Sequence, residues 1–119
     1  MAQPEISYDA PSDCLYLTWV ARVPGTGLMP CQDVLLRVDL ANRRLLSIML
    51  HNFSIRAAGD ERSRTLPLDE LPTMSPDLRE LVLHVLRMPA VSRYLELVEG
   101  AGETLNVVLH ADRIAGERS

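Results

Sequence analysis

The chain has 119 residues, a length that fits one domain able to bury about two-thirds of the surface of its unfolded form. Apolar residues make up 47% of it, which excludes an intrinsically disordered chain, and no apolar run approaches the roughly 20 residues of a membrane span. The net charge is −4, every basic residue is Arg, and five residues are aromatic. This balance argues against a nucleic-acid partner, which needs clustered positive charge and exposed aromatic rings.

The start of the chain, residues 1–5, has neither a basic nor a long apolar stretch, so no signal region is predicted and the expected location is the cytoplasm. Cys14 and Cys31 are compatible with that location. They do not form a Cys-x-x-Cys motif, and the ordinary expectation for Cys14 is a buried strand residue. Cys31 lies in a predicted loop, and the alternative prediction for this residue is a reactive thiol.

Residues 14–20 form the segment around which the fold is expected to be built. Seven apolar, aromatic or β-branched positions without Gly or Pro predict a strand. Alternation places Leu15, Leu17 and Trp19 on one face and Tyr16, Thr18 and Val20 on the other. Because both faces need cover, the strand is expected in the interior of a sheet.

Residues 6–9 predict a strand that pairs with this segment through the turn at residues 10–13. A four-residue loop places Tyr8 opposite Leu15 and Ile6 opposite Leu17. Residues 22–32 contain two Pro and two Gly residues, which predict a long loop.

Residues 33–40 and 45–50 alternate as two further half-buried strands. If Val38 faces Ile48 and Leu40 faces Leu46, an odd turn of three or five residues joins them, with Asn42 in the left-handed position. The same register predicts Leu35 opposite His51 and Arg37 opposite Met49.

Residues 54–71 show no period and predict a linker. Ser75, Pro76 and Asp77 then mark a helix start, and the helix is expected to end near Met88. A second helix is predicted over residues 90–98, ended by Gly100 and Gly102. Residues 104–110 predict a last strand, and residues 111–119 predict a frayed tail.

The residues Tyr8-Asp9-x-x-x-Asp13-x-Leu15-Tyr16-Leu17, followed by Val38-Asp39-Leu40, residues 45–50 and Asn52-x-Ser54, resemble a bacterial family, domain-of-unknown-function family 2283. The resemblance covers residues 5–54. It implies a small β-meander with no catalytic residues to transfer. Members of that family are often encoded beside small toxin-like proteins, so the resemblance also implies a role in binding a partner. The turn at residues 41–44 departs from the acidic, Gly-containing turn of relatives, and residues 66–119 lie outside the resemblance.

Several polar residues invite a functional interpretation. His51, His84 and His110 are of a metal-ligand type, and Asp13, Asp39 and Asp112 could add oxygen ligands. His110 with Asp112 is the best candidate among them. None has the spacing of a metal motif, so the simpler interpretation is that the histidines lie on the surface. Asp9 and Asp13 are a possible carboxylate pair for acid or base chemistry, although turn-capping Asp residues are the simpler interpretation.

Neither a nucleophile site nor an anion site is predicted. Ser12 and Ser54 lack a nucleophile elbow, and the Gly25-x-Gly27 spacing is too short for a phosphate loop. A solvated loop is predicted for Arg56, Arg62 and Arg64, because acidic residues lie between them in the sequence.

The predicted fold is a single α+β domain over residues 1–119. Residues 5–54 form an antiparallel meander of four strands, extended or followed by a fifth at residues 104–110, and two C-terminal helices cover one face. The opposite face predicts an interaction surface made of Tyr16, Thr18, Val20, Leu35, Leu45 and Met49.

The predicted function is a non-enzymatic interaction or regulatory protein without a cofactor or metal, forming a homodimer through that face or through the last strand. The alternative is a small-molecule binder or minor enzyme with a pocket between the helices and residues 22–32.

Overall fold

The computed structural model of the chain describes residues 2–100, 102 and 104–118 as an α+β fold with two antiparallel sheets. The first sheet has five strands in the spatial order β1 (Glu5–Asp9), β2 (Cys14–Thr18), β5 (Arg44–His51), β4 (Val34–Asp39) and β3 (Thr26–Cys31). The second has the order β6 (Thr65–Pro67), β8 (Leu105–Leu109) and β7 (Leu95–Glu99). The helical segments are α1 (Phe53–Ala58), the 3₁₀ turn η1 (Leu71–Thr73), α2 (Pro76–Arg87), α3 (Pro89–Ser92) and α4 (Ala111–Arg118).

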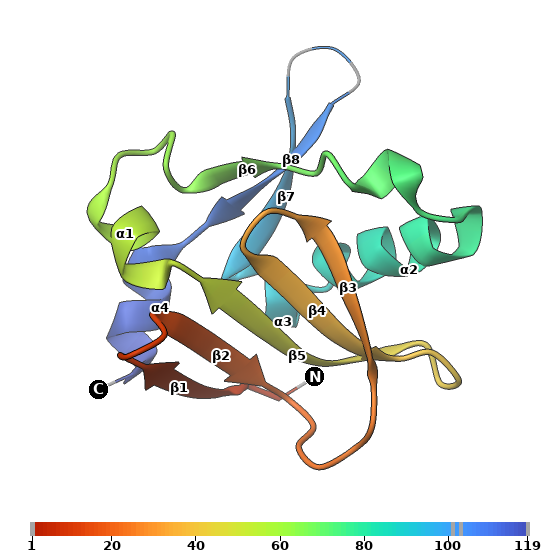
Figure 1. Ribbon diagram of the computed structural model, residues 1–119, viewed down its shortest axis with the longest axis horizontal. Coiled ribbons are helices and arrows are strands. Elements are labelled where there is room, and N and C mark those ends of the chain that lie inside the picture. The colour runs from red at the N-terminus through yellow and green to blue at the C-terminus, as the bar shows by residue number, and fades with distance from the viewer. Residues whose placement is uncertain (1, 101, 103, 119) are drawn as a thin grey trace.

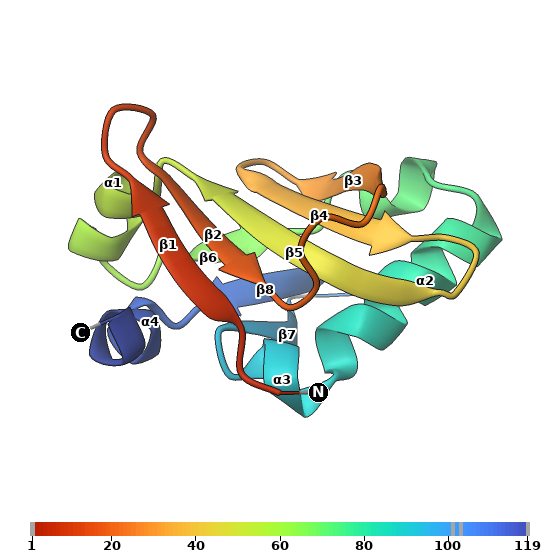
Figure 2. The same cartoon turned by 90° about the horizontal axis from the view of Figure 1, so that it is seen from below.

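The two sheets lie in separate layers (Figure 1). In Figure 2 the five-stranded sheet forms the upper layer, and α2, α3, α4 and the second sheet lie together on its other side. The core between the layers contains buried residues of both, including Leu17 and Ile48 from the first sheet, Val85 from α2 and Val107 from β8. The fold thus covers one face of the large sheet and leaves the opposite face without a second layer.

The predicted interior strand is confirmed. β2 lies between β1 and β5, and Leu15 and Leu17 are fully buried. The hairpin register is also as predicted, with Tyr8 opposite Leu15 and Ile6 opposite Leu17. Trp19 lies just beyond the strand, on the core side, with its ring 6.5 Å from that of Tyr94.

The predicted loop at residues 22–32 is wrong in its second half, because residues 26–31 form the edge strand β3. Leu28 pairs with Leu36 and Cys31 with Val34, and the register shifts between Leu28 and Cys31. Pro30 lies in this irregular part, at a sheet edge where a missing backbone N–H is tolerated. A Gly- and Pro-rich composition therefore marked an irregular edge strand here.

The predicted register between β4 and β5 is wrong. Val38 pairs with Leu45 and Arg37 with Ser47, so the register shifts at this point and Leu46 is an extra residue. Leu35 consequently lies opposite Met49, where the sequence predicted His51. The four residues 40–43 connect the strands, and the left-handed residue is Arg43, with φ 49°, in place of the predicted Asn42.

Residues 54–71 are more regular than the predicted linker. Most of α1, together with β6 and the start of η1, falls in this segment. These elements are short, with six, three and three residues, so they show little periodicity in the sequence. Each depends on contacts with the rest of the fold.

The helix predicted from Ser75 is confirmed. Ser75 is the N-cap and accepts a hydrogen bond from the Leu78 backbone N–H, Pro76 is the first residue of α2, and the helix ends at Arg87. Leu81, Val82 and Val85 are buried on its core face, while Leu78 and Met88 are half-buried.

The predicted helix over residues 90–98 is wrong. Helix α3 ends at Ser92, and residues 95–99 form β7, which pairs with β8 over five positions. Gly100, the predicted helix stop, lies in the β7–β8 connection, where its N–H donates to the Thr104 carbonyl at 2.8 Å. The two predicted helices are therefore one helix and a single turn, and they are not C-terminal.

The predicted last strand is confirmed as β8, but it belongs to the second sheet, between β6 and β7. Both of its edges are paired, so it offers no edge to a second copy of the chain. The predicted frayed tail is wrong for residues 111–118, which form α4 with Ile114 fully buried, and Ser119 lies outside the described residues. Within the described ranges, no helix is long and apolar enough to cross a membrane.

Candidate functional site on the open sheet face

Asp13 ties the first hairpin to α1. Its φ of 52° turns the chain into β2, and its backbone carbonyl accepts a hydrogen bond from Phe53 N–H at 3.1 Å. Its carboxylate accepts from the Tyr8 hydroxyl at 2.6 Å, and from the N–H and hydroxyl of Ser54 at 2.9 and 2.8 Å. We call this set of residues, Tyr8, Asp13, Phe53 and Ser54, the hairpin clamp.

These hydrogen bonds favour the ionised form of Asp13. The Tyr8 hydroxyl is the largest contribution that holds the pKa of Asp13 below its ordinary value of 3.8, followed by the Ser54 N–H. Asp9 is exposed and instead accepts a hydrogen bond from the Ser12 hydroxyl. The two carboxylates therefore have separate hydrogen-bond partners. The carboxylate of Asp13 joins its turn to α1, where the sequence predicted a cap made with nearby backbone amides.

Cys14 and His51 lie next to the hairpin clamp, on the open face. They are cross-strand partners at the ends of β2 and β5, and the Cys14 Sγ lies 3.2 Å from the His51 Nδ1. Cys14 is 5% exposed and His51 is half-buried, yet Cys14 is not part of the core cluster. A thiol beside an imidazole is the combination in which a base accepts the proton of a nucleophile.

Asp33 and Arg56 form an ion pair beside His51. The guanidinium of Arg56 donates to one carboxylate oxygen of Asp33 at 2.7 and 3.0 Å, and the Asn52 side chain donates to the other at 3.1 Å. The Asp33 carbonyl accepts from His51 N–H at 2.9 Å. Arg56 thus joins α1 to the β3–β4 turn, which corrects its prediction as part of a solvated loop.

An apolar row crosses the middle of the open face. Tyr16, Met49 and Leu35 lie side by side on β2, β5 and β4, since Met49 pairs with both of the others. All three are half-buried, and none packs against the core cluster. Thr18, Ser47 and Arg37 form the next row, in which Arg37 donates to Ser47 Oγ at 3.1 Å.

The loop after β2 covers one end of the open face. Arg37 holds it through hydrogen bonds to the carbonyls of Val20, at 3.2 Å, and Val23. Leu46, the extra residue of β5, is fully buried outside the core cluster, and Gly25 passes so close that a Cβ there would lie 2.7 Å from Leu46 Cδ1. Of the predicted interaction face, Leu45 is misplaced, because the register shift turns it into the core.

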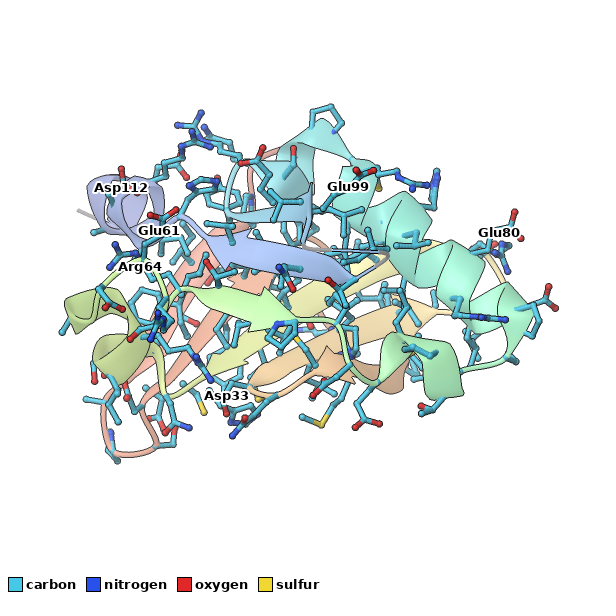
Figure 3. The ribbon with its side chains drawn as sticks, turned by 90° about the horizontal axis from the view of Figure 1, so that it is seen from above. Asp33, Glu61, Arg64, Glu80, Glu99 and Asp112 are labelled. Carbon is cyan, nitrogen blue, oxygen red and sulfur yellow. The ribbon has the colours of Figure 1, made fainter. Side chains whose placement is uncertain are left out.

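A cavity of about 600 Å³ lies between α1, the end of β8 and α4, away from the sheet face. Figure 3 shows Glu61, Arg64 and Asp112 gathered there, and His110 also lines it. Arg64 donates to the carbonyls of Ala57 and Gly59, which occupies part of its guanidinium. This cavity is not the predicted pocket, which was expected between the helices and residues 22–32.

The predicted metal candidates are dispersed. His84 is exposed on α2, and His110 Nε2 pairs with Glu96 at 2.8 Å while Asp112 is exposed in the first turn of α4. Asp39 binds Asn42 and Arg44 in the β4–β5 turn. Across the described part of the chain, no three His, Cys, Asp or Glu residues are grouped as metal ligands.

The Cys14–His51 pair was missed from the sequence. Its two residues are 37 positions apart, and their contact depends on the pairing of β2 with β5, which is not a pairing of neighbours in the chain. The available signal was the alternation that places both residues on the outer face of their strands. Comparison with family models, curated proteins and solved structures gave no match for the chain. The resemblance to domain-of-unknown-function family 2283 stays a prediction.

Proposed function

We propose that this protein is a non-enzymatic interaction module that forms a homodimer through the open face of its five-stranded sheet. The observation that carries the proposal is the apolar row of Tyr16, Met49 and Leu35, which is half-buried and packs against nothing in the core. An apolar patch on a sheet face without a second layer gains free energy when a partner removes it from water.

A second copy of the chain suits this face because the row is self-complementary. A two-fold axis parallel to the strands and above β5 brings Met49 against Met49 of the other copy and Tyr16 against its Leu35. Carboxylates would repel each other at the centre of such an interface. Here Glu5 and Asp9 lie on the edge strand β1, and Asp39 lies at the end of β4, where it pairs with Arg44. These acidic residues lie outside the central apolar row and would belong to a polar rim.

The area of the open face indicates how strongly the two copies of the proposed dimer are expected to associate. Five strands of five to eight residues, about 4.8 Å apart and rising about 3.3 Å per residue, cover roughly 480 Å² in projection. A standard interface buries about 800 Å² of accessible surface per partner, so this face lies at the small end of specific interfaces. A reversible dimer with a dissociation constant of roughly micromolar order is therefore expected.

The test is sedimentation equilibrium from about 1 µM to about 200 µM, a range that brackets a micromolar dissociation constant. The wild-type mass should rise from 13.3 kDa towards twice that value, and Met49→Glu should hold the chain at 13.3 kDa. Ile55→Glu is the matched control, because Ile55 is 68% exposed on α1, away from the face, and should dimerise like the wild type.

Three results bear on the proposal. A wild type that stays monomeric throughout the range would overturn it. Association that Met49→Glu leaves intact, or that Ile55→Glu abolishes equally, would place the interface elsewhere. Circular dichroism of both variants confirms that each remains folded.

A further inference from the structure

Cys14 and His51 bring a thiol and an imidazole into contact on the open face, and the homodimer proposal does not use this contact. The Sγ–Nδ1 distance of 3.2 Å lies within hydrogen-bonding range for a thiol, and the Ser12 carbonyl lies 3.6 Å from the same sulfur. The two residues are direct cross-strand partners, so both backbones are fixed by the sheet ladder. The pair is therefore held by the fold and does not depend on a flexible loop.

We propose that His51 activates Cys14 for thiol–disulfide exchange with low-molecular-weight disulfides, which makes Cys14 a site of reversible S-thiolation. His51 Nδ1 accepts the thiol proton, and the Cys14 sulfur attacks one sulfur of the small disulfide. A protein–small-molecule disulfide forms, the disulfide bond of the reagent breaks, and the leaving thiolate takes the proton from His51. One thiol and one disulfide yield one mixed disulfide and one thiol, so no other oxidant is needed.

The surroundings of Cys14 favour this reaction more than the surroundings of a thiol in the core would. Cys14 lies outside the core cluster, on the face that the second layer does not cover, and its base His51 is half-buried. Two carboxylates adjoin Cys14: Asp9, its cross-strand partner on β1, and Asp13, the preceding residue. Asp13 is engaged by Tyr8 and Ser54, and Asp9 accepts from Ser12.

Cys31 is the internal control that the chain itself provides. It is 1% exposed and belongs to the core cluster. Burial, with a further contribution from Asp69, raises the pKa of the Cys31 thiol to about 12. At neutral pH it has almost no thiolate, and it should stay unreactive in the folded chain.

The test follows the reaction of folded protein with 5,5′-dithiobis(2-nitrobenzoate), a small aromatic disulfide whose released thiolate is coloured. At about 1 µM protein and a micromolar dissociation constant, about half of the chains or more are monomeric, so the open face stays accessible to the reagent. Cys31→Ser, which retains Cys14, should release one equivalent of coloured thiolate per chain, with the adduct on Cys14 in the mass spectrum. Cys14→Ser should release its equivalent only after denaturation. Adding His51→Gln to Cys31→Ser should slow the reaction at least about tenfold.

Three results would overturn the inference. One is an equal rate for Cys14→Ser and Cys31→Ser, and another is a rate that His51→Gln leaves unchanged or raises. The third is a rate for Cys31→Ser that rises steeply with sub-denaturing urea, because the reaction would then require unfolding. None of these results depends on whether the chain dimerises, so the two proposals fail separately.

Discussion

Ile114 gives the sharpest test of the C-terminal helix, because the sequence predicted a frayed tail where the structure has α4. The Ile114 side chain is fully buried within the core cluster. Replacing a buried Ile by Ala costs about 2–5 kcal/mol, from lost apolar burial and the cavity that remains. A terminal helix can undock in response, so we expect the lower part of this range, about 2–3 kcal/mol, for Ile114→Ala.

The assay is thermal unfolding followed by circular dichroism. Unfolding entropy of about 2.1 cal/mol/K per residue makes about 2.5 kcal/mol equivalent to a fall in Tm of roughly 10 °C for this chain. Gly116→Ala is the control on the same helix, since Gly116 is exposed and a Cβ there meets open space. It should raise stability by about 1 kcal/mol, because Ala favours a helix over Gly. A change below about 2 °C for Ile114→Ala, together with no gain for Gly116→Ala, would refute a docked helix.

Two further substitutions test local features of the fold. Ser75→Ala removes the oxygen that accepts the Leu78 N–H at 3.4 Å, and should lower the free energy of unfolding in urea by about 1 kcal/mol, with the m-value unchanged. Asp13→Asn tests the hairpin clamp through pH. The folded pKa of Asp13 lies below its ordinary 3.8, so its carboxylate contributes stability that is complete above that pH and is lost as pH falls through the folded pKa. Between about pH 5 and pH 2 the wild-type Tm should fall more steeply than that of Asp13→Asn, and parallel curves would contradict the role of the clamp.

The features that the sequence predicted correctly are set by nearby residues. The start of α2 follows from Ser75, Pro76 and Asp77, whose side chains act within one helical turn. The register of the first hairpin follows from the length of one short loop. Neither feature needs knowledge of what lies across the core.

The errors arise where tertiary contacts override a local pattern. Val91, Tyr94, Leu95 and Val98 have helical spacing, but a helix there would have been short and only marginally stable. Leu95 and Val98 instead pair with β8, while Val91 is buried in the single turn α3 and Tyr94 is buried just before β7. The alternating pattern predicted that Leu46 pairs in a regular strand. Leu46 is instead the extra residue of a bulge, and the sequence of one strand does not show where a bulge lies.

The candidate site was visible in the sequence only as separate polar residues, and the structure divides their roles. Asp13, part of the resemblance, accepts hydrogen bonds from Tyr8 and Ser54, two other residues of the same motif, which gives that motif a structural explanation. Asp13 directly precedes Cys14, and Ser54 follows His51 by three positions, so the clamp joins the two chain segments that carry the thiol and the imidazole. The pairing of β2 with β5 places Cys14 against His51, and the clamp adds a second connection between the same two segments next to the pair.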